Sequence, residues 1–528
     1  MLIKGNLNSN KTDILIDSCV KLLNQGVSAD KILVIVQNFK KKNEFTKKIK
    51  EKLEIEALTN LNIYTFFGLV YNKILENWLL VENKIKDDNA KITPNLSGLE
   101  VSQYIFKNAI DEIKFKGYNS KVNLLHQLLR RYSLCVLNAL TPDEIKDRSR
   151  ILLDPFYSDI KNALNLYKLK TLNLRAFDYL RQADIFKFIY ENTLNSFEYV
   201  FLDDGDEITP ALFQYLNHIK KDVKEFFIAY DEFGCTRKGF LGALEFDFER
   251  FLNEKPVILK PSFKDKKADE IFTAVKNETP VLIENSIKKS FIRQDEMIED
   301  VINQITALLS NPKNRLQPSD ISIITPNIDN YLKMQFGKLN YPVKFLSGSG
   351  KLSHNPVIGS ILEILKILNN KNLKISPYIL RGILAKILKT DFILTLKITD
   401  KYEVDGEDIF KTLKNFKDNK NIERFLELSN EIKDLKLSEQ LFAISNEYIP
   451  LTLENKDNIY KINQLLKQIR DFEETFKDSV SNKELIFQLE NTIISENPLN
   501  SEVKEENAII VSTAQKIIDN SIKSKHTF

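Results

Sequence analysis

The sequence has few of the residues that build disulfide frameworks and zinc sites. Only 3 cysteines and 4 histidines occur among 528 residues. The cysteines, Cys19, Cys135 and Cys235, are scattered without paired spacing. This pattern argues against a disulfide framework and against a structural zinc site, and it fits a reducing compartment. We therefore expect a cytoplasmic protein.

Long apolar runs are also missing. No run approaches the roughly 18 to 20 apolar residues that cross a bilayer, and the segment Met1–Gly5 turns polar too soon for a signal peptide. We therefore expect no membrane partner. The charges nearly balance, because 76 basic and 73 acidic residues leave a net charge of +3. So small an excess does not by itself indicate nucleic acid, and a DNA-binding interpretation has to rest on local features.

Glycine and proline are scarce, with 15 of each. Helix should therefore be the majority state, and strands should occur as short apolar runs. A chain of this length is too long for one hydrophobic core, and its length indicates roughly three to four domains.

The order of apolar runs and helical periodicity predicts two α/β units, each interrupted by a helical block. The first opens as strand, helix, strand, with the helix at Lys11–Gln25 and a further one expected at Gln294–Leu309 in the second unit. Strands are expected at Leu2–Lys4, Ile32–Val36, Ile63–Phe67, Tyr199–Leu202, Glu225–Tyr230, Val281–Ile283, Ile321–Ile324 and Ala508–Ser512. The predicted divisions are residues 1–80 and 191–262 for the first unit, 81–190 for its helical insertion, 280–372 and 504–528 for the second unit, and 373–503 for the second insertion.

The loop after the first strand has the spacing of a phosphate-binding loop. Its residues are Gly5, Asn6, Leu7, Asn8, Ser9, Asn10, Lys11 and Thr12. They match the Walker A spacing, except that Asn10 replaces the second glycine. Asparagine tolerates the left-handed backbone region better than other non-glycine residues. We predict that this loop binds ATP through its backbone N–H groups and Lys11, and that the Thr12 hydroxyl coordinates Mg²⁺. The alternative is an Asn/Ser-rich turn that caps a helix.

Four carboxylates follow the apolar strand that ends at Leu202. They belong to Asp203, Asp204, Asp206 and Glu207. Ligands of open parallel sheets bind at the carboxyl ends of the strands. One carboxylate there can hold Mg²⁺, and its neighbour can orient or deprotonate an attacking water. The alternative is a cluster of like charges in a solvated turn.

This acidic segment resembles the Walker B motif of the UvrD/Rep helicases of superfamily 1. In that motif an apolar strand runs into Asp-Glu, then a Gln-Asp pair, then Thr-Pro and a helix. Asp203 matches the magnesium-binding Asp, Asp204 stands at the catalytic Glu, and Thr209-Pro210 matches the end of the motif. The resemblance implies a P-loop NTPase with tandem RecA-like motor domains, each with a helical insertion. Asp204 would then activate water with a carboxylate one methylene shorter than the family's.

Further segments resemble the family in the same order. Thr65-Phe66-Phe67 resembles the Thr-Phe-His stretch that contacts single-stranded DNA, where stacking on an aromatic ring is worth roughly 1 to 3 kcal/mol per base. The alternative is that Phe66 and Phe67 are core residues. Later matches depart from the pattern: Leu241 and Pro326 stand where the family has arginine, and Gln515 where it has histidine. The sixth motif would lie beyond Phe528, so we expect the second motor domain to be incomplete.

A basic stretch follows the second strand. It contains Lys40–Lys42 with Lys47, Lys48, Lys50 and Lys52. These lysines have the charge to contact DNA phosphates. Because Glu44 and Glu51 are interspersed, we favour a solvated helix face.

The sequence therefore leaves three functional hypotheses. The first is an ATP-dependent DNA helicase or translocase of the UvrD/Rep type. It would be an ATP hydrolase that uses Mg²⁺ and moves 3′ to 5′ on single-stranded DNA. We expect its altered motifs and incomplete end to impair it in this chain. Helicase–nuclease or repair proteins would be its partners. The second is a non-catalytic nucleotide- and DNA-binding scaffold similar to the AddB-type subunits of helicase–nucleases, favoured by Leu241 and Pro326. The third, a P-loop kinase, fits two separate α/β units poorly.

Overall fold

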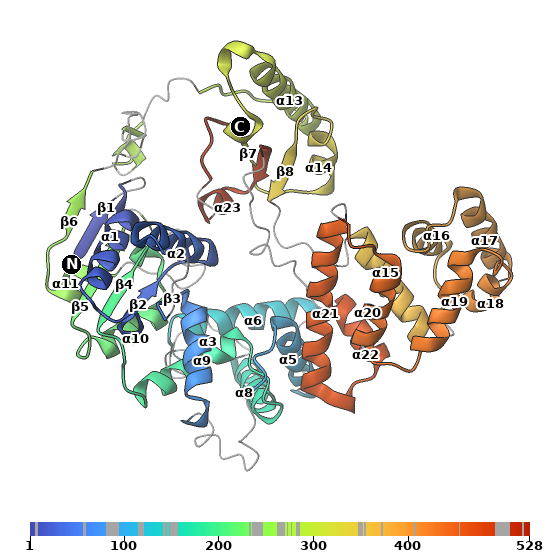
Figure 1. Ribbon diagram of the computed structural model, residues 1–528, viewed down its shortest axis with the longest axis horizontal. Helices are drawn as coiled ribbons and strands as arrows, with labels where there is room; N and C mark the ends of the chain where they lie inside the picture. Colours follow the sequence, from blue (N-terminus) through green and yellow to red (C-terminus); the bar gives the residue numbers. More distant parts are fainter. Residues whose placement is uncertain are drawn as a thin grey trace. The chain divides into compact units, whose positions relative to one another are not determined.

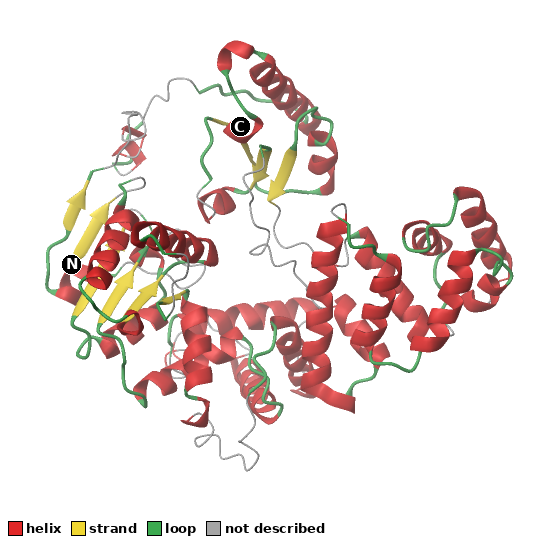
Figure 2. Ribbon diagram, in the orientation of Figure 1, coloured by secondary structure: helices red, strands yellow, loops and turns green. Residues whose placement is uncertain are grey.

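The computed structural model gives the chain two compact units. It describes all residues except 6–8, 56–59, 81–93, 114–120, 141–143, 145–146, 148–156, 232–233, 235–245, 261–269, 272, 276, 281–285, 347–351, 353–354, 371–372, 406–407, 453–454, 492–506 and 520–521. Unit 1 comprises Met1–Pro261 and Lys351–Ile494, and unit 2 comprises Ser262–Gly350 and Ser495–Phe528. Helix predominates and the strands form two parallel sheets, so the fold class is α/β (Figures 1 and 2).

The sheet of unit 1 has six parallel strands in the order β3-β2-β4-β5-β1-β6. The strands are β1 (Leu2–Gly5), β2 (Ile32–Ile35), β3 (Asn62–Tyr64), β4 (Tyr199–Leu202), β5 (Glu225–Tyr230) and β6 (Val257–Leu259). Five of them confirm expected strands, and β6 was not predicted. The expected third strand was wrong at its end, because Thr65 caps a helix there and the strand stops at Tyr64.

Helices cover both faces of this sheet (Figure 1). Along β1, Ile3 packs into the core on one face and Leu2 into the core on the other. The central strands β1, β2, β4 and β5 are thus largely buried on both sides, which is why they appear in the sequence as apolar runs. One face carries α1 (Lys11–Asn24) and α2 (Phe39–Leu53), and the other carries α3 (Phe66–Glu76), α9 (Tyr179–Glu191), α10 (Pro210–Ile219) and α11 (Phe248–Leu252).

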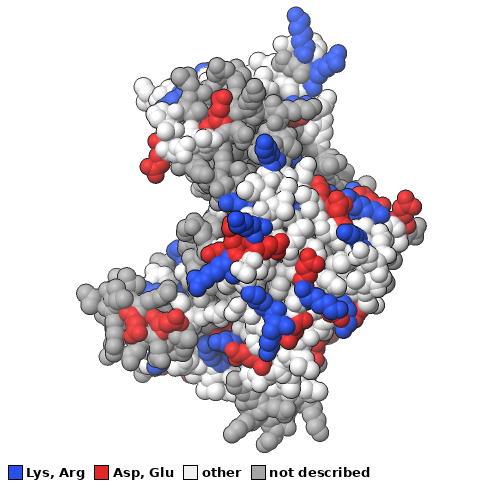
Figure 3. Space-filling model, turned by 90° about the vertical axis from the view of Figure 1, so that its left-hand side faces the viewer, with Lys and Arg blue, Asp and Glu red and all other residues white. Residues whose placement is uncertain are grey.

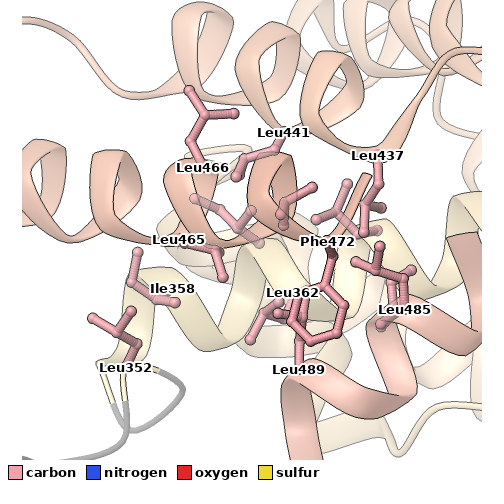
Figure 4. Packing of buried hydrophobic residues seen from close by; sticks show 14 of the residues in the cluster. Leu352, Ile358, Leu362, Leu437, Leu441, Leu465, Leu466, Phe472, Leu485 and Leu489 are labelled. Atoms are coloured by element: carbon pink, nitrogen blue, oxygen red, sulfur yellow. The ribbon is translucent and has the colours of Figure 1, made fainter. Parts of the chain in front are cut away.

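The two helical blocks of the sequence share one hydrophobic core within unit 1. The first contributes α5 (Leu99–Ile113), α6 (Lys121–Leu137), α8 (Tyr157–Asn173) and part of α9. The second contributes α15 (Pro356–Asn369), α16 (Pro377–Lys386), α17 (Phe392–Asp405), α18 (Ile409–Lys414), α19 (Lys420–Ile432), α20 (Leu437–Tyr448), α21 (Lys456–Phe476) and α22 (Asn482–Asn491). Figure 4 shows leucines of α15, α20, α21 and α22 meeting in this core. Polar contacts also join the blocks: Tyr104 Oη donates to Glu484 Oε1 at 2.7 Å.

Unit 2 has a smaller parallel sheet in the order β10-β7-β9-β8. Its strands are β7 (Ile321–Ile324), β8 (Val343–Leu346), β9 (Ile509–Ser512) and β10 (His526–Thr527), and its helices are α13 (Gln294–Ser310), α14 (Asn330–Phe336) and α23 (Ala514–Asp519). The expected strands β7 and β9 and the expected helix α13 are confirmed. The strand expected at 281–283 lies outside the described residues.

No helix in the described parts of the chain combines the length and the apolar character that crossing a membrane requires.

Candidate functional site

Gly5 and the segment Ser9–Thr12 lie at the point where the strand order of the unit 1 sheet reverses. After β1 the chain crosses to β2, whereas after β5 it passes β1 in the opposite direction to reach β6. Right-handed crossovers in opposite directions place their helices on opposite faces, and α1 and α11 do lie on opposite faces. A crevice for ligands forms at such a switch point, beyond the carboxyl ends of the strands.

The described part of the loop is tightly folded. A Cβ atom on Gly5 would lie 2.2 Å from Ser9 Oγ, so only glycine fits there. Ser9 is buried, and its hydroxyl has no hydrogen-bond partner among the described residues. Asn10 has the expected left-handed backbone, with φ 58° and ψ 25°, and its side chain makes no capping hydrogen bond. A turn that merely caps α1 would use that side chain. Asn6, Leu7 and Asn8 lie outside the described residues.

The start of α1 contacts the acidic end of β4. Thr12 Oγ1 lies 3.0 Å from Asp203 Oδ1 and 3.1 Å from Asp203 Oδ2 and donates to this carboxylate. Asp203 is 2% exposed, so the alternative of a solvated turn does not hold for this residue. The structure thus brings together the hydroxyl and the carboxylate that the sequence predicted as Mg²⁺ ligands.

Lys11 contacts a carboxylate that the sequence analysis did not single out. Its Nζ lies 3.6 Å from Asp231 Oδ2, just after β5, and both side chains are largely buried. Asp206 also contacts Asp231: its Oδ1 accepts a hydrogen bond of 2.7 Å from the Asp231 N–H. The contact exists because β5 lies between β1 and β4 in the sheet. Only the sheet order, not the sequence spacing, predicts it.

The acidic segment carries more negative charge than its burial favours. Burial, and then the neighbouring charge of Asp204, raise the pKa of Asp203 from its ordinary value of 3.8 to about 7. Burial also raises the pKa of Asp206, to about 6. Both shifts mean that the ionised forms are disfavoured here and that a cation would be bound favourably.

The donor set fits Mg²⁺ bound together with phosphate. The described residues contain no group of three or more His, Cys, Asp or Glu side chains that could hold a metal ion by themselves. Mg²⁺, however, usually takes only one or two carboxylates from the protein and completes its shell with substrate phosphates and water. Asp203 offers one such carboxylate, and the Thr12 hydroxyl oxygen, 3.0 Å from it, offers a second oxygen ligand.

A third predicted residue, Asp204, is held by a lysine of α2. Its backbone is left-handed, with φ 51° and ψ 52°. Its Oδ2 lies 3.5 Å from Lys41 Nζ. Lys41 belongs to the basic stretch, and its place in the sequence does not predict a contact with this site.

The basic stretch forms most of α2 and is largely paired. Lysine–carboxylate pairs join Lys40 to Glu44, Lys47 to Glu51, Lys48 to Asp13 and Lys52 to Asp17. Figure 3 likewise shows basic and acidic side chains intermixed on the face in view. These pairs agree with the interpretation of a solvated helix face, and contact with DNA phosphates stays a prediction.

The residues predicted to contact DNA follow β3. Thr65 Oγ1 accepts a hydrogen bond of 3.2 Å from the Gly68 N–H and so caps α3. The Phe66 ring lies 6.1 Å from that of Phe186, and the Phe67 ring 5.0 Å from that of Tyr179. Both phenylalanines are partly buried against the cores of unit 1. The structure therefore gives them packing roles, and their contact with DNA is untested.

The remaining positions are in unit 2 or undescribed. Pro326 follows β7 and Gln515 lies in α23, both just beyond the carboxyl ends of strands. Leu241 lies outside the described residues. Comparison of the chain with protein-family models and with curated proteins finds no match.

Proposed function

We propose that this chain is an ATP-driven motor for single-stranded DNA, of the UvrD/Rep helicase or translocase type, with a P-loop and tandem RecA-like domains. The observation that carries the proposal is the hydrogen bond from Thr12 to the buried Asp203. It joins a loop of Walker A spacing to a carboxylate of Walker B type at the carboxyl edge of one parallel sheet.

The contacts of the site suggest a role for each residue. Lys11 exchanges Asp231 for the terminal phosphate, since a phosphate carries more negative charge than the carboxylate it now faces. Thr12 and Asp203 would hold Mg²⁺, which would neutralise phosphate charge. Asp204 orients the attacking water and accepts its proton.

The DNA part of the proposal rests on the resemblance and on where the segment lies. Thr65–Phe67 follows β3, and all strands of this sheet are parallel. The segment therefore lies at the same edge of the sheet as the loop of residues 5–12. A cytoplasmic location belongs to the proposal and rests on the scattered cysteines.

The test is ATP hydrolysis with and without single-stranded DNA, for the wild-type chain, Lys11→Ala and the control Lys21→Ala. Lys21 is an exposed lysine on the same helix. We expect hydrolysis that DNA stimulates, that Lys11→Ala abolishes and that Lys21→Ala leaves unchanged. No hydrolysis, together with DNA binding that is indifferent to Lys11, would reject the motor and support the non-catalytic scaffold.

A further inference from the structure

Three consecutive lysines at the start of α2 have different surroundings. Lys40 Nζ lies 3.8 Å from Glu44 Oε1, and its side chain is 41% exposed. The ammonium group of Lys42 lies 5.3 Å from the centroid of the Tyr64 ring. Lys41 is 22% exposed and pairs with Asp204. The Lys41 ammonium group thus contacts the acidic segment.

The backbone fixes Lys41 in this place. The Asn38 side chain caps α2 by accepting a hydrogen bond of 3.0 Å from the Lys41 N–H. Immediately before the cap, β2 is in register with β4, with Ile35 opposite Leu202. The Asp203 N–H donates to the Ile35 carbonyl at 3.0 Å, which extends the pairing into the acidic segment. The first turn of α2 is thereby held beside Asp203 and Asp204.

Lys41 offsets the repulsion between the carboxylates of the acidic segment. Asp203 and Asp204 are adjacent, and the Asp203 carboxylate is buried. Two neighbouring carboxylate charges repel each other more strongly inside a protein than in water. An ammonium group on Asp204 Oδ2 offsets the repulsion and fixes the direction of the carboxylate. The second oxygen of Asp204 then remains as the acceptor for a water proton.

We infer that Lys41 is a positioning residue for ATP hydrolysis, which holds Asp204 in the orientation that activates water. This inference rests on the proposed function and adds to it a residue of α2 whose observed partner is Asp204. A positioning role predicts loss in the chemical step and not in nucleotide binding, because the nucleotide contacts of Lys11 and Thr12 stay in place.

The test compares kcat and KM for ATP in the wild-type chain, Lys41→Met, Lys41→Arg and the control Lys187→Met. Lys187 forms a similar pair with Glu191 on the exposed surface of α9. We expect Lys41→Met to lower kcat roughly 10- to 100-fold, as misplacement of a catalytic group does. KM and the affinity for Mg²⁺–ADP should stay within about twofold. Lys41→Arg should recover most of kcat, and Lys187→Met should match the wild type.

Other outcomes overturn the inference in distinguishable ways. A raised KM with unchanged kcat would make Lys41 a phosphate ligand, and lost DNA affinity with unchanged DNA-free hydrolysis would make it a DNA ligand. In both cases the proposed function would stand. A wild-type chain without Lys11-dependent hydrolysis would overturn both proposals. Thermal unfolding checks the fold of each variant, and Lys41→Gln replaces Lys41→Met in the comparison if the methionine variant does not fold.

Discussion

Replacing Asp203 by asparagine tests the electrostatics of the site without a ligand. Asparagine has nearly the same shape and keeps an oxygen that accepts the Thr12 hydroxyl hydrogen bond. It removes the charge whose burial raises the pKa of Asp203. We therefore expect Asp203→Asn to stabilise unit 1 at alkaline pH while it removes the proposed Mg²⁺ ligand.

The size of the effect follows from the pKa. A rise from 3.8 to about 7 is about 3 pH units, or about 4 kcal/mol at 1.36 kcal/mol per unit. Because the folded-state pKa is the higher one, the folded state binds the proton more tightly. Stability is therefore lost as pH rises through the window from 3.8 to about 7, and the full cost is present above it. Asparagine escapes this cost, so its advantage should be about 3 kcal/mol larger at about pH 8 than at about pH 4.5.

The assay is urea unfolding followed by tryptophan fluorescence. Trp78 is the chain's single tryptophan, and it is buried in unit 1 with its ring 5.4 Å from that of Phe177. Its transition therefore reports on unit 1. An advantage of Asp203→Asn that is equal at both pH values, or a loss of stability at the higher pH, would refute the assignment of a buried carboxylate with a raised pKa.

Changes at three other places test the fold and the site. Thr12→Val removes the hydroxyl that donates to Asp203, so the free energy of unfolding should fall by about 1 to 3 kcal/mol in the urea assay, and calorimetric titration should show weaker Mg²⁺–ATP binding. Arg181→Met removes the buried guanidinium that pairs with Asp184, which keeps Lys168 as a partner, and thermal unfolding by circular dichroism should show a loss of about 1 to 3 kcal/mol. A chain ending at Ile494 lacks β9 and β10, two of the four strands of unit 2. Its tryptophan transition should persist, and amide hydrogen exchange should show unit 2 unprotected.

The strands that sequence predicts are those buried on both faces. Ile32–Ile35 is a continuous apolar run inside its sheet, and Ile321–Ile324 is apolar except for the buried Ser322; burial selects such residues. The edge strands β6, β8 and β10 escape prediction because they are short and lie at the edges of their sheets, where burial does not impose a long apolar run. Val257 and Ile258 of β6 are exposed, and so are both residues of β10. Their pairing depends on partners more than 200 residues away in the sequence.

At the end of the third strand, two local sequence signals compete. Aromatic residues favour strands, so the run Ile63–Phe67 indicated one. Thr65, however, is also a favoured residue at the start of a helix, and its hydroxyl caps α3 in the structure. The capping signal, followed by the helical spacing of Leu69 and Val70 as buried residues, marks the boundary correctly.

The candidate site likewise contains residues that the sequence predicts and residues that only the sheet order explains. Thr12 and Asp203 could be predicted because each belongs to a short motif whose residues are adjacent in the chain. Lys41 and Asp231 could not, because their partners depend on which strands are neighbours. The interspersed glutamates indicate a solvated face for the whole basic stretch, and Lys40 does pair with Glu44 there, whereas Lys41 pairs with Asp204.

The cost of the site is itself an argument for a ligand. A turn with only a structural role has no reason to bury Asp203 beside Asp204, where burial, and then the charge of Asp204, raise the pKa of Asp203 to about 7. Replacement by a neutral residue would relieve that cost, and buried charges are kept mainly where they bind or react. Nor does capping explain the loop, since Asn10 makes no capping hydrogen bond and the Ser9 hydroxyl is buried without a partner among the described residues. A cation between Thr12 and Asp203, with an anion at the start of α1, would relieve both costs together, and Mg²⁺ bound to a nucleotide phosphate supplies both charges.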